Sequence, residues 1–151
     1  AALVRRGCRT SQREELTMRF MMLMYPGPAA ETTAIPGDES IARMMAYNEE
    51  LTKAGVLLAL DGLHPSATGA RIRVVDGVKA IVDGPFSEAK ELIGGYWLIQ
   101  VRSREEALAW ASRIPLGNSE MVEIRQVYEL SELSAEAQRL SAPVADALGR
   151  A

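Results

Sequence analysis

His64 and Asp83 are the side chains in this sequence best suited to moving a proton. His64 is the only histidine among 151 residues, and an imidazole is the one side chain whose ordinary pKa falls in the physiological range. It lies in Gly62-Leu63-His64-Pro65-Ser66, where an apolar strand-like run ends. Asp83 ends another such run, so its carboxylate can orient the imidazole if the two strand ends meet. Plain turn chemistry explains both residues equally, with the aspartate bonding backbone N–H groups and the histidine as a polar loop residue.

Five other side chains are candidates for binding a substrate. Arg73 and Lys90 can hold a carboxylate, and the aromatic residues Phe86, Tyr96 and Trp97 can line a small pocket. Each group also has a structural interpretation, because exposed cations are commonly solvated and aromatic residues in strands commonly pack in a core.

Other kinds of site have no sequence signature. One histidine, the distant Cys8 and scattered carboxylates do not have the spacing of a metal site. Ser66 lacks a separate base and the strained turn of a serine nucleophile. No glycine-rich loop joins a strand to a helix, so a nucleotide site is not expected. We therefore expect no metal and no cofactor, and any chemistry would be cofactor-free.

Size and charge indicate a single acidic domain. The chain has 48% hydrophobic residues and a formal charge of −3, which suits one domain with a proper core. Residues 1–17 hold four arginines and two glutamates, so residues 18–151 carry −5. This charge favours neither nucleic acid nor an anionic membrane as a partner. A lone cysteine, and no apolar run of about 20 residues, predict a cytoplasmic protein.

The apolar patterns predict an α+β fold of the ferredoxin-like type, βαββαβ, with an inserted β-hairpin. Residues 1–17 are expected to be a leader outside this fold, 18–129 the domain, and 130–151 a tail that contains an amphipathic helix. A capping box at Ser103 and Glu106 marks the start of the second helix. The predicted elements are a strand at 20–25, a helix from 38–40 to Gly55, a strand at 56–60, hairpin strands at 71–75 and 79–82, a strand at 95–101, a helix after Ser103 and a strand at 121–128.

The first two strands are apolar throughout, which predicts burial on both faces. Because two helices cover only one face of such a sheet, we expect a second subunit to cover the other face. The sequence thus predicts a homodimer.

The run Asp83-Gly84-Pro85-Phe86-Ser87-Glu88-Ala89-Lys90-Glu91 and the segment around His64 closely resemble the YCII-related superfamily, in the branch named for its DGPF motif. The resemblance runs from about Met18 to Glu129. The more usual motif has Ala and Thr where this chain has Ser87 and Ala89. The resemblance implies a dimeric α+β barrel.

Other branches of this superfamily place a histidine on the first helix and pair it with an aspartate. This chain has Met44, Met45, Tyr47 and Asn48 on that helix instead, so a dyad of His64 and Asp83 is a substitute hypothesis. One function implied is a cofactor-independent lyase or isomerase acting on a small oxygenated or aromatic substrate.

The alternative is a non-enzymatic small-molecule-binding or regulatory protein. The resemblance implies an association with extracytoplasmic-function sigma factors for that second function. A contact between His64 and Asp83 at an open pocket would favour the enzyme.

Overall fold

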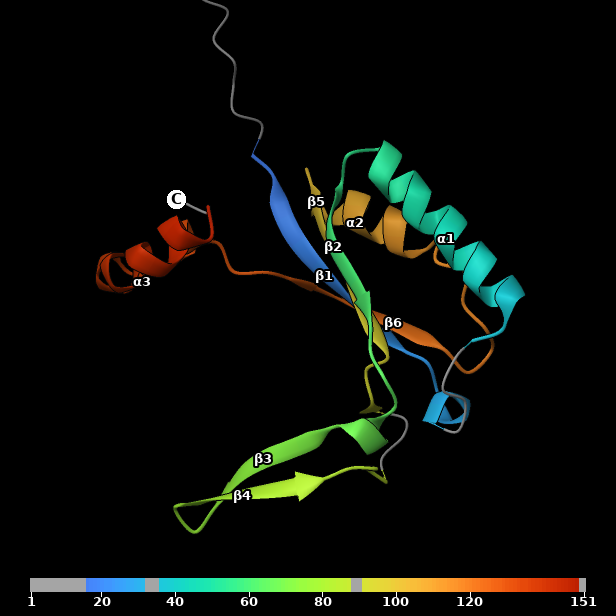
Figure 1. The fold of residues 1–151 in the computed structure, drawn as a ribbon. Coiled ribbons are helices and arrows are strands. Elements are labelled where there is room, and N and C mark those ends of the chain that lie inside the picture. Colours follow the sequence, from blue (N-terminus) through green and yellow to red (C-terminus); the bar gives the residue numbers. More distant parts are fainter. Residues whose placement is uncertain (1–15, 32–35, 88–90, 150–151) are drawn as a thin grey trace, which may run out of the picture.

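The computed structural model describes residues 16–31, 36–87 and 91–149. The centre of the fold is a four-stranded antiparallel sheet, and two helices cover one of its faces (Figure 1). The strand order β2-β5-β1-β6 is that of the predicted ferredoxin-like α+β fold, with the first strand inside the sheet. The strands are β1 (Met18–Tyr25), β2 (Leu57–Gly62), β5 (Gly95–Val101) and β6 (Met121–Gln126), and the covering helices are α1 (Asp38–Lys53) and α2 (Arg104–Ala111) (Figure 1).

The predicted hairpin forms a separate two-stranded sheet, β3 (Ala70–Val75) and β4 (Val78–Asp83). Its turn places Asp76 and Gly77 at φ 50° and 78°, a conformation that favours Asp-Gly because few other side chains tolerate positive φ. The hairpin projects from the end of the main sheet (Figure 1). Ile72 and Ile81 face each other across the two strands and are 69% and 71% exposed.

Burial in the central strand alternates with the pleat. Phe20, Met22 and Met24 face the helices and are buried, whereas Met21 and Leu23 face the other way and are half-buried. The expected burial on both faces is therefore seen on only one face of a single chain, because both helices pack on that face. The opposite face of the sheet is called the open face below.

One stripe of α1 faces the sheet. Tyr47, Asn48 and Leu51 are buried, whereas Ile41 and Met45 are 37% and 49% exposed. The residues that face the sheet follow the helical period from Leu51 back to Tyr47, and Met45 falls beside this stripe.

The second helix begins as the sequence predicts. The Ser103 hydroxyl accepts a hydrogen bond from the Glu106 N–H at 3.1 Å, and the Glu106 carboxylate accepts one from the Arg102 N–H at 2.9 Å. The last strand ends two residues earlier than predicted, at Gln126. None of the helices in the described ranges is long and apolar enough to span a membrane.

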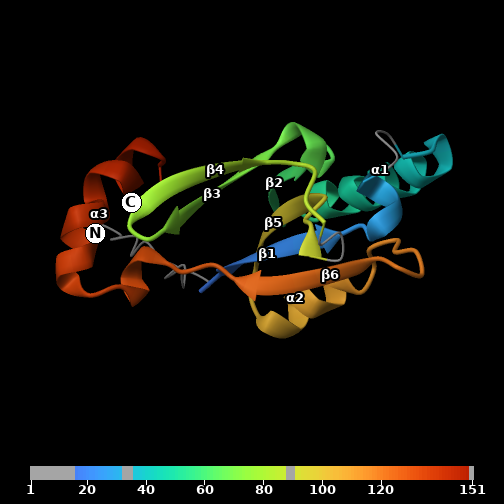
Figure 2. The same ribbon diagram turned by 90° about the horizontal axis from the view of Figure 1, so that it is seen from below.

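The predicted C-terminal helix is α3 (Ala135–Ala147), and the short 3-10 helix η4 (Leu130–Glu132) comes just before it. Two other 3-10 helices lie earlier in the chain, η1 (Pro28–Glu31) and η2 (Ser66–Thr68). Helix α3 carries an exposed apolar row, Leu140, Val144 and Leu148. Figures 1 and 2 show α3 and the hairpin both reaching past the sheet on the side away from α1. A groove of about 820 Å³ separates α3 from the open face, with Leu58 and Leu98 in its lining.

Candidate functional site

The structure places His64 just after β2 and Asp83 at the end of β4, and both side chains are exposed. No hydrogen bond or ion pair joins them within the described residues. The contact that would favour an acid–base pair is therefore not made in this structure.

The two sequence motifs nevertheless meet, through Ser66. The Ser66 hydroxyl accepts a hydrogen bond from the Phe86 N–H at 3.0 Å and donates to the Glu31 carboxylate, which also accepts from the Ser66 N–H. The Gly84 N–H donates to the Gly69 carbonyl at 2.9 Å. The His64 loop and the Asp83 turn thus lie side by side and hold the base of the hairpin.

Of the two cationic candidates, the structure describes only Arg73. Arg73 is exposed on β3. The neighbouring Arg71 places its guanidinium 4.1 Å from the centre of the Phe86 ring, a cation–π contact at the base of the hairpin. Lys90 lies outside the described residues.

The three aromatic candidates occupy three different places. Phe86 lies at the hairpin base, while Tyr96 and Trp97 point to opposite faces of β5 because they are adjacent in a strand. The Tyr96 hydroxyl donates to Asp61 at 2.8 Å, and this hydrogen bond raises the pKa of Tyr96. Only Trp97 points toward the helices.

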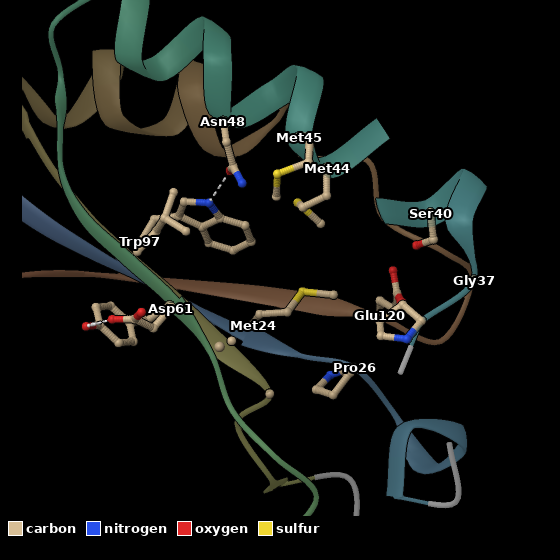
Figure 3. A pocket seen from close by; sticks show the side chains of 16 residues that line it. Met24, Pro26, Gly37, Ser40, Met44, Met45, Asn48, Asp61, Trp97 and Glu120 are labelled. Atoms are coloured by element: carbon tan, nitrogen blue, oxygen red, sulfur yellow. Dashed lines mark hydrogen bonds between the residues drawn. The ribbon is translucent and has the colours of Figure 1, made fainter. Parts of the chain in front are cut away.

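A cavity of about 490 Å³ lies between α1 and the helix-facing side of the sheet (Figure 3). This size is in the range of small-molecule sites. Its walls are mainly apolar, and the apolar side chains that line it include Met24, Pro26, Met44, Met45, Leu60 and Trp97. Thioether side chains adapt to differently shaped ligands, which suits a binding site.

Asn48 supplies a polar group inside this cavity. It is 8% exposed, and its Oδ1 accepts a hydrogen bond from the Trp97 Nε1–H at 2.8 Å. Because an indole nitrogen only donates, the amide oxygen must face Trp97 and the amide nitrogen must point elsewhere. Figure 3 shows that nitrogen turned toward the cavity. No group among the described residues accepts a hydrogen bond from it.

Tyr47 packs against Trp97 and helps to hold it in this position. Its ring meets the Trp97 ring edge to face, with centroids 6.0 Å apart, and its hydroxyl donates to the Trp110 carbonyl at 3.0 Å. Burial raises the pKa of Tyr47 well above its ordinary value. Burial thus favours the neutral form of Tyr47, which donates this hydrogen bond.

Two glycines at the floor of the cavity allow their backbone to lie very close to neighbouring segments of the chain. A Cβ on Gly94 would lie 2.6 Å from Cγ of Pro26, and one on Gly95 would lie 2.8 Å from the Asp61 carbonyl oxygen. The Gly-Gly pair in the sequence thus lets strand β5 pack closely against the β1 end and against β2.

At the opposite wall, Glu120 is half-buried, and its Oε2 accepts a hydrogen bond from the Gly117 N–H at 2.5 Å. Neither Asn48 nor Glu120 was a candidate in the sequence, because an asparagine on a helix and a glutamate before a strand carry no spacing signal. One signal for Asn48 did exist. It stands on the helix where other branches carry a histidine, and Met44, Met45 and Asn48 on that stretch all line the cavity.

Comparison with known proteins supports the relationship suggested by the motifs. An uncharacterized protein of Rhizobium meliloti (strain 1021) is 34% identical over 82 residues, which make up 54% of this chain. The matched part spans 66% of that relative, slightly less than two thirds of its length. The family model of the YCII-related domain matches residues 18–131, which is most of the chain and the whole of the sheet with α1 and α2. The chain therefore belongs to the YCII-related domain family.

Proposed function

We propose that this domain binds a small, largely apolar organic molecule in the cavity between α1 and the sheet. The observation that carries the proposal is the buried Asn48 amide, which Trp97 orients so that its nitrogen faces the cavity. The nitrogen of this amide has no acceptor among the described residues and reaches the open space of the cavity, because no fully buried side-chain nitrogen or oxygen there lacks a partner. A ligand oxygen or ring nitrogen that accepts from it would gain a hydrogen bond worth about 0.5–1.5 kcal/mol.

The probe for this proposal is tyrosol, a neutral molecule with a phenol ring and a short alcohol. The chain has two tryptophans, and Trp97 lines the cavity whereas Trp110 does not. In ¹H–¹⁵N NMR spectra, tyrosol should shift the Trp97 indole signal in a saturable way, with a dissociation constant on the order of 1 mM for so small a ligand. The Trp110 signal should stay in place.

Met45→Trp tests whether that shift arises in the cavity. The larger ring should fill the space beside Asn48 and weaken tyrosol binding about tenfold or more. Met121→Trp is the matched control, because Met121 is similarly exposed, at 51% against 49%, and does not line the cavity. A saturable shift that persists in Met45→Trp, or no saturable shift in the wild type, would contradict the proposal.

A cofactor-independent lyase or isomerase using His64 is the second candidate. It has one observation in its favour, since His64 lies two residues after Gly62, which lines the cavity. An enzyme of this kind needs an electrostatic link between His64 and Asp83. In NMR spectra at constant pH, Asp83→Asn should then move the ring signals of the single histidine, and unchanged signals would count against the dyad.

The motif around Asp83 supports placing the chain in the DGPF branch of its family, and with it the implied regulatory association with extracytoplasmic-function sigma factors.

We also propose a homodimer that covers the open face. The half-buried apolar residues of that face and the exposed apolar row of α3 support this assembly. Sedimentation that shows a monomer at micromolar concentration would exclude it.

A further inference from the structure

We infer that the cavity selects amine-bearing cationic ligands over neutral ones, and neutral ligands over anions. The inference rests on the small-molecule binding proposed above and names the class of ligand. None of the described residues that line the cavity is a lysine, an arginine or a histidine, whereas Asp61 and Glu120 are among them.

The two carboxylates differ in their hydrogen-bond partners and in their position relative to the cavity. Asp61 accepts the hydrogen bond of Tyr96, and Figure 3 shows its side chain across β2 from Met24 and Trp97. Glu120 lies on the cavity side, between Met24 and the start of α1 (Figure 3). Glu120 is therefore the carboxylate that a bound molecule can reach.

Among the described residues, a single contact engages the Glu120 carboxylate, and it uses one of the two oxygens. Oε2 accepts from the Gly117 N–H, and Oε1 has neither a hydrogen bond nor an ion pair within the described ranges. A carboxylate oxygen free of a protein cation favours a ligand ammonium through a charge-assisted hydrogen bond. It disfavours a ligand carboxylate by repulsion.

Among the described residues of this wall, the N-terminus of α1 is the one positive feature, since Gly37 and Ser40 line the cavity. Its partial charge would favour an anion. The first turn of the helix contains Asp38 and Glu39, which offset that charge. The surplus of five acidic groups in residues 18–151 adds to the same effect.

The cavity thus has a hydrogen-bond donor at Asn48 and a negative acceptor at Glu120, with methionines between them and Trp97 beside Asn48 (Figure 3). The ligand that fits is a ring or chain with an oxygen or nitrogen acceptor at one end and an amine at the other. Tyramine has these features, with its phenol oxygen as the acceptor for Asn48 and its ammonium for Glu120.

Three probes that share one ring test the inference, namely tyramine, tyrosol and 4-hydroxyphenylacetate. At pH 7 and low salt, the Trp97 indole titration should give tyramine a dissociation constant about 3 to 10 times lower than that of tyrosol. The anion 4-hydroxyphenylacetate should bind more weakly than tyrosol by a similar factor.

Glu120→Gln should abolish the advantage of tyramine over tyrosol, because the amide can still accept from the Gly117 N–H but has no charge to attract the ammonium. Glu105→Gln is the control. It removes the same charge from an exposed position on α2 outside the cavity, and the order of the three probes should stay as in the wild type.

The outcomes separate this inference from the proposed function. If tyrosol shifts Trp97 but 4-hydroxyphenylacetate binds best, the ligand class is wrong and the binding site stands. If Glu120→Gln keeps the preference for tyramine, Glu120 is not the source of that preference, and the inference fails while the binding site stands. If none of the three probes shifts the Trp97 signal, the binding function itself is overturned.

Discussion

Replacing Gly84 by alanine should destabilise the protein by about 3 kcal/mol or more, which is large for a single added methyl group. A Cβ at this position would lie 1.8 Å from the Ser66 carbonyl oxygen and 2.6 Å from its carbon. Both are backbone atoms, so no side-chain rotation can relieve the overlap, and the Asp83 turn must separate from the His64 loop. Urea unfolding followed by far-UV circular dichroism measures the loss.

Gly69→Ala is the matched control in the same junction. Its φ of −107° suits any residue, and an added Cβ would come no closer than 3.5 Å to the Ser66 carbonyl oxygen. We expect its unfolding free energy to stay within about 0.5 kcal/mol of the wild type. If Gly84→Ala were equally mild, the close packing of the two motifs would be disproved.

Trp97→Leu should have the other large effect, a loss of about 3 kcal/mol in unfolding free energy and the loss of tyrosol binding. The indole is 5% exposed, packs edge to face on Tyr47 and orients Asn48. Leucine would leave a void beside Tyr47 and would leave the Asn48 oxygen buried without its donor. Urea unfolding followed by circular dichroism measures the stability.

Two further variants make this result interpretable. Trp110→Leu changes a half-buried tryptophan outside the cavity, so a loss of only about 1 kcal/mol with intact tyrosol binding is expected. Trp97→Phe keeps a ring and removes only the N–H, and should cost about 1–2 kcal/mol. Equal losses for Trp97→Leu and Trp110→Leu would contradict the central place given to Trp97.

The sequence predicted the fold well because its elements rest on local signals. The apolar run of β1, the Asp-Gly turn of the hairpin and the cap at Ser103 each specify a nearby conformation, and all three are confirmed. Local signals could not predict what covers the open face of the sheet. A strand that is apolar throughout shows only that both faces can be covered, and one chain supplies helices for one face.

The candidate site was much less predictable. His64 and Asp83 were chosen for their chemistry, and their loops do meet, but the hydrogen bonds that join the loops come from Ser66. Ser66 had no sequence signal for this role, because its partners Glu31 and Phe86 lie 35 and 20 residues away in the chain.

The Asn48 amide illustrates the same limit. Its orientation depends on Trp97, which lies 49 residues later on another element. Side-chain spacing along one helix shows which residues share a face, and it does not show which polar group on a second element will pair with them.

The most direct test of ligand binding in the cavity uses the methionines of the chain, of which there are seven. With ¹³C-labelled methionine methyl groups, tyrosol added to the wild-type protein should give intermolecular nuclear Overhauser effects to Met24, Met44 and Met45, which line the cavity. It should give none to Met21 on the open face or to Met121. Effects confined to Met21 and Met121, with none to the three cavity methionines, would show that the molecule binds elsewhere and would contradict the account.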